Sequence, residues 1–397
     1  MDINGLKDNI SKIIQDDKQE LFSISQYIYD NPEMNFKEYK ACKVLTEYLE
    51  KSGFNLTKNA GGLDTAFTAE YCPTGIKYPV IAILAEYDAL SIGHACGHNI
   101  IATTAVGAGM ALKQVMDQQN IKGTLRVIGT PAEEGGGGKI IMQKHGVFDD
   151  VDSMFLLHPT SGVTKIAGNC RSSYKLIVEY HGKAAHASSH PDKGINAVDA
   201  AHICYTALSC LRQQVISGIS IMPLILNGGT ENGLVPDYSK LVINIRGFNL
   251  KSMMDTVGKI KNCAKAGAVA TGCTVDIKEI PGYYGRVKSQ ILGNVCRKNF
   301  ELLGEPLMDG MVDDNGGEDF GNLNRVIPGV MVYPTLLPEE KISNHTERFK
   351  ELANSPKSRD VIILGSEVMA YSALDLFNDT SIIDAAKEEL KELQKTF

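Results

Sequence analysis

Apolar residues along this chain follow two patterns, and each predicts a different kind of β-strand. Residues 80–84, 125–129 and 154–157 are almost wholly apolar, which is typical of strands covered on both faces in a parallel sheet. Residues 174–180 and 240–246 instead alternate between apolar and polar, as antiparallel strands with one solvent face do. The chain therefore combines two kinds of sheet.

Helical spacing accounts for much of the chain between these strands. In residues 37–51, apolar positions recur at intervals of three and four, and Gly53 follows the run as a helix-ending residue. The same reasoning predicts helices over residues 7–30, 196–215, 251–267 and 289–303. The apolar residues 330–333 predict one more buried strand.

The order of these elements predicts two domains. Up to about Gly168, helices alternate with buried strands, which indicates a mostly parallel mixed sheet with helices on both faces. Residues 169–282 then follow a strand–helix–strand–strand–helix–strand order, an α+β (ferredoxin-like) insert. We therefore predict an α/β catalytic domain from residues 1–168 and 283–397, interrupted by a smaller dimerisation or lid domain. The length of 397 residues exceeds the roughly 250–300 at which a single core stops growing.

Composition excludes several classes of partner. The net charge of −7 argues against nucleic acid and anionic lipid as ligands. No apolar run approaches the ~18 residues needed to span a bilayer, and the N-terminus lacks the basic and apolar regions of a secretory signal. Nine cysteines without a spacing framework suit a reducing compartment. We expect a cytoplasmic protein.

Polar side chains with catalytic chemistry follow the buried strands. Cys96 and His98 form a short-range pair of the kind zinc favours, although a small buried cysteine beside a helix-capping histidine would give the same pattern. Glu133 and Glu134 follow the second buried strand, where one carboxylate can bind a cation and the other can act as a base. An exposed acidic turn is the alternative for such a pair.

Other motifs carry less information on their own. His158 ends the third buried strand, where a satisfied core histidine is more common than a ligand. His186 and His345 are also weak signals when each is taken singly. The glycines at 135–138 and Lys139 do not form a phosphate-binding loop, because Glu133 and Ile140 occupy positions that need glycine and serine or threonine. We expect these glycines to permit a tight turn and close packing before a helix.

Taken in order, these motifs resemble a known family. The arrangement is similar to the co-catalytic metallopeptidases and amidohydrolases that include carboxypeptidase G, aminoacylase and the indoleacetyl-amino-acid hydrolases. Within them it resembles the branch with Cys-Gly-His, and especially its aminobenzoyl-glutamate hydrolase-like and dipeptidase-like members. The resemblance extends from about Tyr27 to His345, and residues 85–90 together with 94–99 are its most specific part.

The resemblance implies a centre with two divalent metal ions, for which Zn²⁺ is favoured and Mn²⁺ or Co²⁺ could substitute. It implies that Cys96 bridges the ions and that four further ligands surround them: His98, Glu134, His158 and His345. Asp88 would be a catalytic residue that orients the ligands or tunes Glu133, and Glu133 would be the general base. Two positions depart from the family pattern: Glu86 stands where many relatives have a histidine ligand and is not counted as one, and Asn99 replaces a common aspartate.

The resemblance also assigns residues of the insert. Arg246 would bind the substrate carboxylate, with Asn232 nearby, although Gly233 stands at the family's asparagine position and Asn232 is shifted by one. His186 would stabilise the oxyanion, and by family analogy it comes from the neighbouring subunit of a homodimer formed through the insert.

Three hypotheses follow. The first is metal-dependent hydrolysis of the amide bond of a small acyl-amino acid or peptide, by a metal-activated water with Glu133 as general base. The second is a thiol hydrolase with Cys96 as nucleophile and His98 or His94 as base; it would survive chelation and be inactivated by a thiol alkylator. The third is a non-catalytic metal-binding protein, in which Glu133 would have no role. The first accounts for the most residues.

Overall fold

The computed structural model describes residues 2–229 and 231–395, which form two compact units. Among these residues, unit 1 comprises 2–169, 287–314 and 318–395, and unit 2 comprises 170–286 and 315–317. No helix in the described part of the chain is both long and apolar enough to cross a bilayer. Each unit has a sheet and a hydrophobic core of its own.

Unit 1 is built on an eight-stranded mixed sheet, ordered β1-β2-β4-β3-β5-β12-β6-β11. Its central strands β4, β3, β5 and β12 run parallel to one another, and antiparallel pairs join β1 to β2, β2 to β4 and β12 to β6. The strands are β1 (Asn55–Lys58), β2 (Phe67–Tyr71), β3 (Val80–Glu86), β4 (Thr124–Thr130), β5 (Ser153–Leu157), β6 (Thr164–Cys170), β11 (Leu307–Asp314) and β12 (Gly329–Tyr333).

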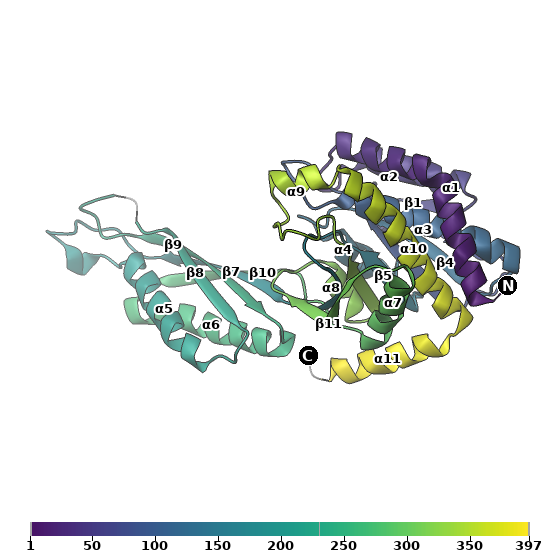
Figure 1. Cartoon of the computed structure of the whole chain (residues 1–397). Coiled ribbons are helices and arrows are strands. Elements are labelled where there is room, and N and C mark those ends of the chain that lie inside the picture. Colours follow the sequence, from purple (N-terminus) through teal and green to yellow (C-terminus); the bar gives the residue numbers. More distant parts are fainter. Residues whose placement is uncertain (1, 230, 396–397) are drawn as a thin grey trace. The chain divides into compact units, whose positions relative to one another are not determined.

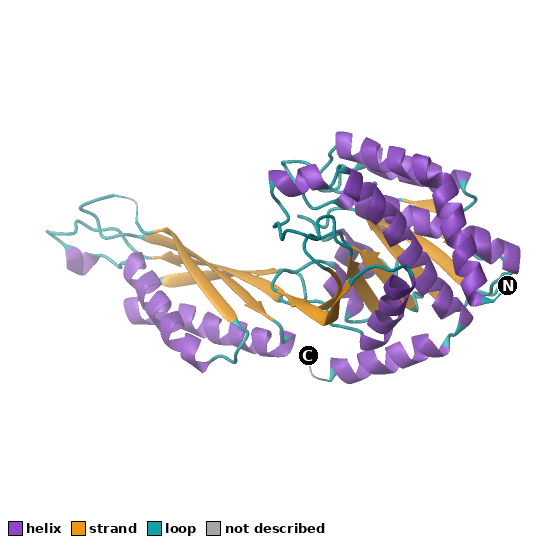
Figure 2. Ribbon diagram, in the orientation of Figure 1, coloured by secondary structure: helices purple, strands orange, loops and turns teal. Residues whose placement is uncertain are grey.

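Helices cover both faces of this sheet (Figures 1 and 2). They are α1 (Ile3–Asp30), α2 (Tyr39–Lys51), α3 (His98–Gln119), α4 (Gly138–Lys144), α7 (Gln290–Leu302), α8 (Phe320–Asn324), α9 (Glu347–Leu352), α10 (Pro356–Asn378) and α11 (Ser381–Gln394). Along β3, Ile81 and Ile83 join the core under α1, α3 and α10, whereas Ala82 and Leu84 join the core under α4 and α8. Two buried faces explain why the strand is apolar throughout.

Unit 2 has a four-stranded antiparallel sheet, ordered β10-β7-β9-β8, with two helices packed on one face (Figure 2). The elements are β7 (Ser172–His181), α5 (Ala197–Leu211), β8 (Ser220–Asn227), β9 (Tyr238–Gly247), α6 (Leu250–Thr271) and β10 (Thr274–Pro281). Tyr174 and Leu176 face the helices and are buried, whereas Lys175 between them is exposed. The predicted fold class, a mixed α/β sheet with a ferredoxin-like α+β insert, is confirmed.

Candidate active site

The ends of three adjacent parallel strands supply the candidate site. Asp88 lies two residues beyond β3, Glu133 three residues beyond β4, and His158 directly after β5. Strands β4 and β5 both pair with β3 in parallel, so their carboxyl ends meet at one edge of the sheet, where open α/β folds bind ligands. Residues far apart in sequence are thereby brought together.

The five predicted metal ligands form two overlapping groups. Cys96, His98 and His158 offer donor atoms that all lie within 4.8 Å of one another, and Cys96, Glu134 and His345 do the same. Because Cys96 belongs to both groups, its sulfur lies where an atom shared by two cations would lie. A third group joins His98 and Glu134 to Glu133.

Hydrogen bonds at Nδ1 orient the rings of His98 and His158. His98 Nδ1 lies 3.1 Å from Asp88 Oδ1, and His158 Nδ1 lies 2.8 Å from the carbonyl oxygen of Pro159. Both rings therefore present Nε2 to the group, and His158 Nε2 lies 3.2 Å from the Cys96 sulfur. Metal-binding histidines are held in this way, with the second nitrogen bonded to a carboxylate or carbonyl.

One buried nitrogen provides a test of whether a cation fits. His98 Nε2 has no hydrogen-bond partner among the described residues, and the carboxylate oxygens of Glu86 and Glu134 lie 3.8 and 3.9 Å away. Buried polar atoms are nearly always satisfied. This nitrogen lies near a carboxylate oxygen and the Cys96 sulfur. Nitrogen, oxygen and sulfur donors of this kind bind a divalent ion such as Zn²⁺, which would satisfy the nitrogen.

Burial and charge set the protonation of these groups. Burial would lower the pKa of His98, but the Asp88 carboxylate and Cys96 outweigh it and raise that pKa well above its ordinary value. Burial and the nearby His98 lower the pKa of His158 to about 4, which keeps its imidazole neutral, as a metal ligand requires. Burial raises the pKa of the Cys96 thiol to about 12, whereas an unassisted thiol nucleophile needs a lowered pKa.

A tight turn between β4 and α4 places the two adjacent glutamates. Ala132 has a φ of 58°, and its carbonyl accepts hydrogen bonds from the N–H groups of Gly136 and Gly137. A Cβ on Gly138 would lie 1.9 Å from the Pro131 carbonyl oxygen, so this close approach requires glycine. The expectation of a tight turn and close packing here is confirmed.

Within this turn the two carboxylates have different surroundings. Glu134 Oε1 lies 3.2 Å from His345 Nε2, and the Glu134 N–H donates to Asp88 Oδ2 at 2.9 Å. Glu133 is largely buried. Burial, together with the charges of Glu86 and Asp319, raises the pKa of Glu133 well above that of a free glutamate, as a group that takes up a proton requires.

The loop that carries His345 contacts the segment that carries Cys96. His345 has a φ of 64°, its N–H donates to the Ala95 carbonyl at 2.9 Å, and its side chain is 53% exposed. A Cβ on Gly97 would lie 2.5 Å from a ring carbon of Pro159, which follows His158. The segments bearing Cys96, His158 and His345 are thus held in contact, with His345 on the open side.

Sequence reasoning missed a buried ion-pair network. Lys139, which the sequence presents only as a lysine after a glycine run, has no exposed side-chain surface, and its Nζ lies 2.6 Å from both Glu86 Oε1 and Asp319 Oδ1. Burial, with Glu86 adding to it and Lys139 opposing it, raises the pKa of Asp319 to about 6. No local feature of the sequence identifies this lysine as buried, because its partner Asp319 lies 180 positions away in the chain.

The three predicted residues of the insert lie in unit 2, at two places. His186 and Asn232 are on neighbouring loops, joined by a hydrogen bond from the Ala187 N–H to the Gly233 carbonyl at 2.9 Å. Arg246 lies near the other end of β9, paired with Ser173 of β7. Thr230, two positions before Asn232, lies outside the described residues.

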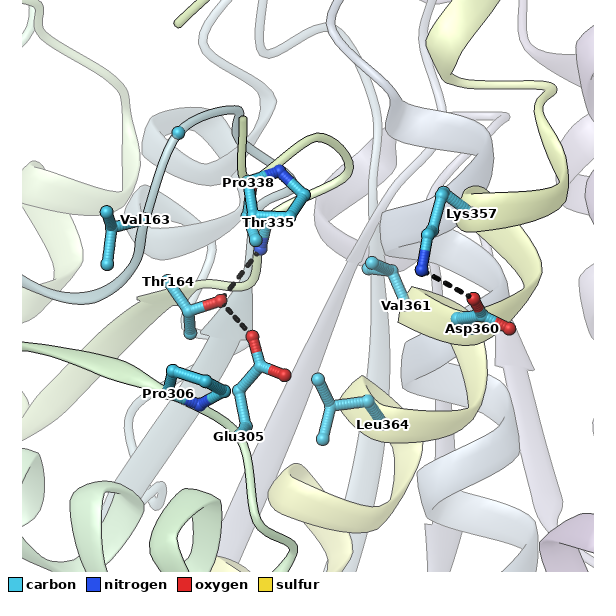
Figure 3. Close-up of a pocket in the computed structure, with 11 residues that line it drawn as sticks. Val163, Thr164, Glu305, Pro306, Thr335, Pro338, Lys357, Asp360, Val361 and Leu364 are labelled. Carbon is cyan, nitrogen blue, oxygen red and sulfur yellow. Dashed lines mark hydrogen bonds and ion pairs between the residues drawn. The ribbon is translucent and has the colours of Figure 1, made fainter. Parts of the chain in front are cut away.

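Unit 1 also has a pocket that is lined by none of the predicted site residues. It has a volume of about 460 Å³ and lies among β6, α10 and the segments around Glu305 and Thr335. Figure 3 shows the Thr164 hydroxyl between Thr335 and the Glu305 carboxylate, and these residues bond to one another. The predicted site residues of unit 1 are therefore not among the residues that line this pocket.

Comparison with known proteins identifies relatives of this chain. Residues 87–364 match the family described as peptidase family M20/M25/M40. The chain is 34% identical to the Xaa-Arg dipeptidase of Mus musculus, over 97% of this chain and 92% of that protein. It is 31% identical to one of the subunits of the p-aminobenzoyl-glutamate hydrolase of Escherichia coli, over 75% of this chain and 65% of that protein.

Solved structures show the same fold. A putative aminohydrolase from Staphylococcus aureus superposes with a TM-score of 0.81 at 19% identity, over 93% of this chain and 99% of that one. A Bacillus subtilis protein described as a dinuclear metal binding peptidase superposes with a TM-score of 0.73 at 21% identity, over 92% of this chain and 99% of that one.

Proposed function

This chain belongs to the peptidase family M20/M25/M40, and on that premise we propose that it is a metal-dependent hydrolase of the amide bond in small peptides or acyl-amino acids. The observation that carries this proposal is the pair of overlapping donor groups that share Cys96, with Glu133 beside them. A structural metal site would need the donors but not an additional buried glutamate.

We assign the cations to the residues that surround the shared sulfur. Two divalent ions, preferably zinc because thiolate and imidazole suit it, would be held by Cys96, His98, Glu134, His158 and His345, and Cys96 is the donor that two of the groups share. When bound, such ions polarise a water molecule and the substrate carbonyl. Asp88 would hold two ligand segments in place, because it accepts from the Glu134 N–H and contacts His98 Nδ1.

Glu133 would move the protons. Its raised pKa favours uptake of a proton from the attacking water, and the same group can return the proton to the leaving amine. His186 would donate a hydrogen bond to the oxyanion, and Arg246 would pair with the substrate's free carboxylate through two parallel hydrogen bonds. Dipeptides are the first class to test, since the Mus musculus relative is named for Xaa-Arg dipeptides.

The separation of His186 and Arg246 supports a homodimer. The His186 loop lies at the Tyr238 end of β9, since the Gly182 N–H donates to the Asp237 carbonyl. Arg246 lies eight positions after Tyr238 along this extended strand, a distance of roughly 26 Å. A small substrate cannot contact both residues of one chain, so we propose that His186 acts on the site of the partner subunit.

An exposed strand edge in unit 2 suits the same assembly. Strand β8 is at the edge of its sheet, and the side chains of Met222, Leu224 and Leu226 are 43, 57 and 55% exposed. Apolar edge strands with unpaired backbone groups pair readily with another chain. We propose that two copies associate through this part of unit 2. We also place the protein in the cytoplasm, because its nine cysteines form no disulfide in the described part of the chain.

Chelation and a substrate panel test the function directly. The metal-free protein should not hydrolyse Xaa-Arg dipeptides, acyl-amino acids or aminobenzoyl-glutamate, and added Zn²⁺ or Mn²⁺ should restore hydrolysis of at least one of them. Activity that persists without metal and is lost on thiol alkylation would support the Cys96 nucleophile instead. Metal binding without hydrolysis of any substrate would support a non-catalytic protein.

A further inference from the structure

Lys139 is a buried cation that joins three segments of unit 1. It is the second residue of α4, and its Nζ lies 2.6 Å from Glu86 at the end of β3 and 2.6 Å from Asp319 at the start of α8. None of the three side chains is more than 1% exposed. A buried charge is costly unless its partners are close and well placed, so these contacts hold the three segments at a fixed spacing.

The same contacts fix the turn that carries Glu133. Asp319 binds Lys139 twice, because its Oδ2 also accepts from the Lys139 backbone N–H at 3.1 Å. This anchors the first turn of α4, a few residues after Glu133. At the other end of the turn, the Glu134 N–H is held by Asp88, which follows Glu86 by two residues in the chain.

We propose that Lys139 is a positioning residue, whose buried ion pairs with Glu86 and Asp319 hold the Glu133 turn against the end of β3. The proposal rests on the proposed role of Glu133 as general base. Lys139 acts through the backbone of the turn and contacts neither substrate nor metal. A shift of about 1 Å at a reacting group can cost on the order of 100-fold in rate, so a loosened turn should lower kcat in particular.

The test is Lys139→Met, measured in two ways. In the metal-loaded enzyme we expect kcat to fall roughly 100-fold, with KM changed less than about threefold and both metal ions retained. In the metal-free protein we expect faster amide hydrogen exchange across residues 131–139, with exchange in α3 and α10 unchanged. The exchange measurement does not depend on activity, so it still tests Lys139 if the wild-type protein proves unable to hydrolyse amides.

Lys7 provides a matched control. It is another buried lysine of unit 1, with Nζ 2.7 Å from both Asn299 Oδ1 and Asp375 Oδ1, and it belongs to none of the candidate donor groups. Lys7→Met should leave kcat unchanged. An equal loss of kcat in both variants would overturn the proposal. So would a Lys139→Met variant whose kcat and amide exchange are those of the wild type, whose exchange is raised throughout unit 1, or which loses its metal ions.

Asp319→Asn covers the case in which Lys139→Met does not fold. The amide keeps the shape of the side chain but removes the charge that pairs with Lys139. We expect the same selective fall in kcat and the same local rise in exchange, both smaller than in Lys139→Met. Wild-type kcat and exchange in Asp319→Asn would overturn the proposal.

Discussion

At the scale of single residues, the candidate site separates two kinds of carboxylate. Glu134 faces His345 and is available to bind a cation, whereas burial and the nearby charges of Glu86 and Asp319 raise the pKa of Glu133. The same residue type can therefore serve as ligand and as base at neighbouring positions, because the environment sets the charge of each.

Glu133→Gln tests the role of the base. The change removes proton uptake but no proposed ligand, so kcat should fall by roughly 10²–10⁴-fold while metal content and thermal stability stay near wild type. Single-turnover kinetics and metal analysis of the purified variant are the measurements. A near-normal kcat would mean that another group takes the proton.

Cys96→Ser tests the shared ligand. A hydroxyl is a poor replacement for a bridging thiolate, so the variant should retain less metal after dialysis than the wild type, and its activity should depend on added Zn²⁺. Metal content after dialysis against a weak chelator is the measurement. Wild-type retention of both ions would exclude Cys96 as a ligand.

At the scale of elements, the strands of unit 2 determine which residues can share a site. Alternation along β9 places Arg246 and Asn244 on the face of the sheet opposite α5 and α6, and both line a hollow of about 470 Å³ on that face. Strand geometry thus gives Arg246 an accessible position for a substrate carboxylate.

Arg246→Ala should raise KM for substrates with a free carboxylate far more than for the corresponding amides or esters. A charge-assisted contact disappears while the metal chemistry is untouched. Steady-state kinetics on matched pairs of substrates measure the difference. Equal effects on both members of each pair would remove Arg246 from the substrate site.

How much the sequence predicted depended on the kind of element. Strand β3 was predicted because both of its faces are buried, which leaves it wholly apolar. Strand β11 was not, because half of its residues are exposed at the edge of the sheet and its sequence includes three aspartates and a glycine. Its place in the sheet is set by tertiary contacts that no local pattern records.

The candidate site, like the strands, could be predicted from the sequence only in part. The proposed ligands and Glu133 stand at strand ends or in motifs that resemble a family, so they could be named before their geometry was known. The pairing of Lys139 with Asp319 joins residues 180 positions apart and follows only from the folded chain. Glu86 was left out of the predicted ligand set, and its contact with Lys139 could not be inferred from sequence.

At the scale of the whole molecule, a shared active site makes a strict prediction for mixed dimers. His186→Ala and Glu133→Gln homodimers should both be nearly inactive, yet a mixed dimer has one site with both residues intact. Random exchange gives about half mixed dimers, so activity should recover to about a quarter of wild type if the sites act independently.

Co-expression of the two variants with different affinity tags provides the measurement. The unfractionated mixture should show the quarter recovery, and doubly purified protein, which contains only mixed dimers with one intact site of two, should show about half of the wild-type activity. The matched control is Glu133→Gln paired with a tagged copy of itself, which should remain inactive. Inactive mixed dimers would place His186 in the site of its own chain or outside the site altogether.

The length of β9 has a consequence for how the protein behaves in dilute solution. If Arg246 and His186 reach one substrate only from two chains, a dissociated chain has an incomplete site, however well its metal centre is formed. The turnover rate per chain should then decline once the protein concentration falls below the dissociation constant of the dimer, and a substrate analogue that spans both chains should hold them together.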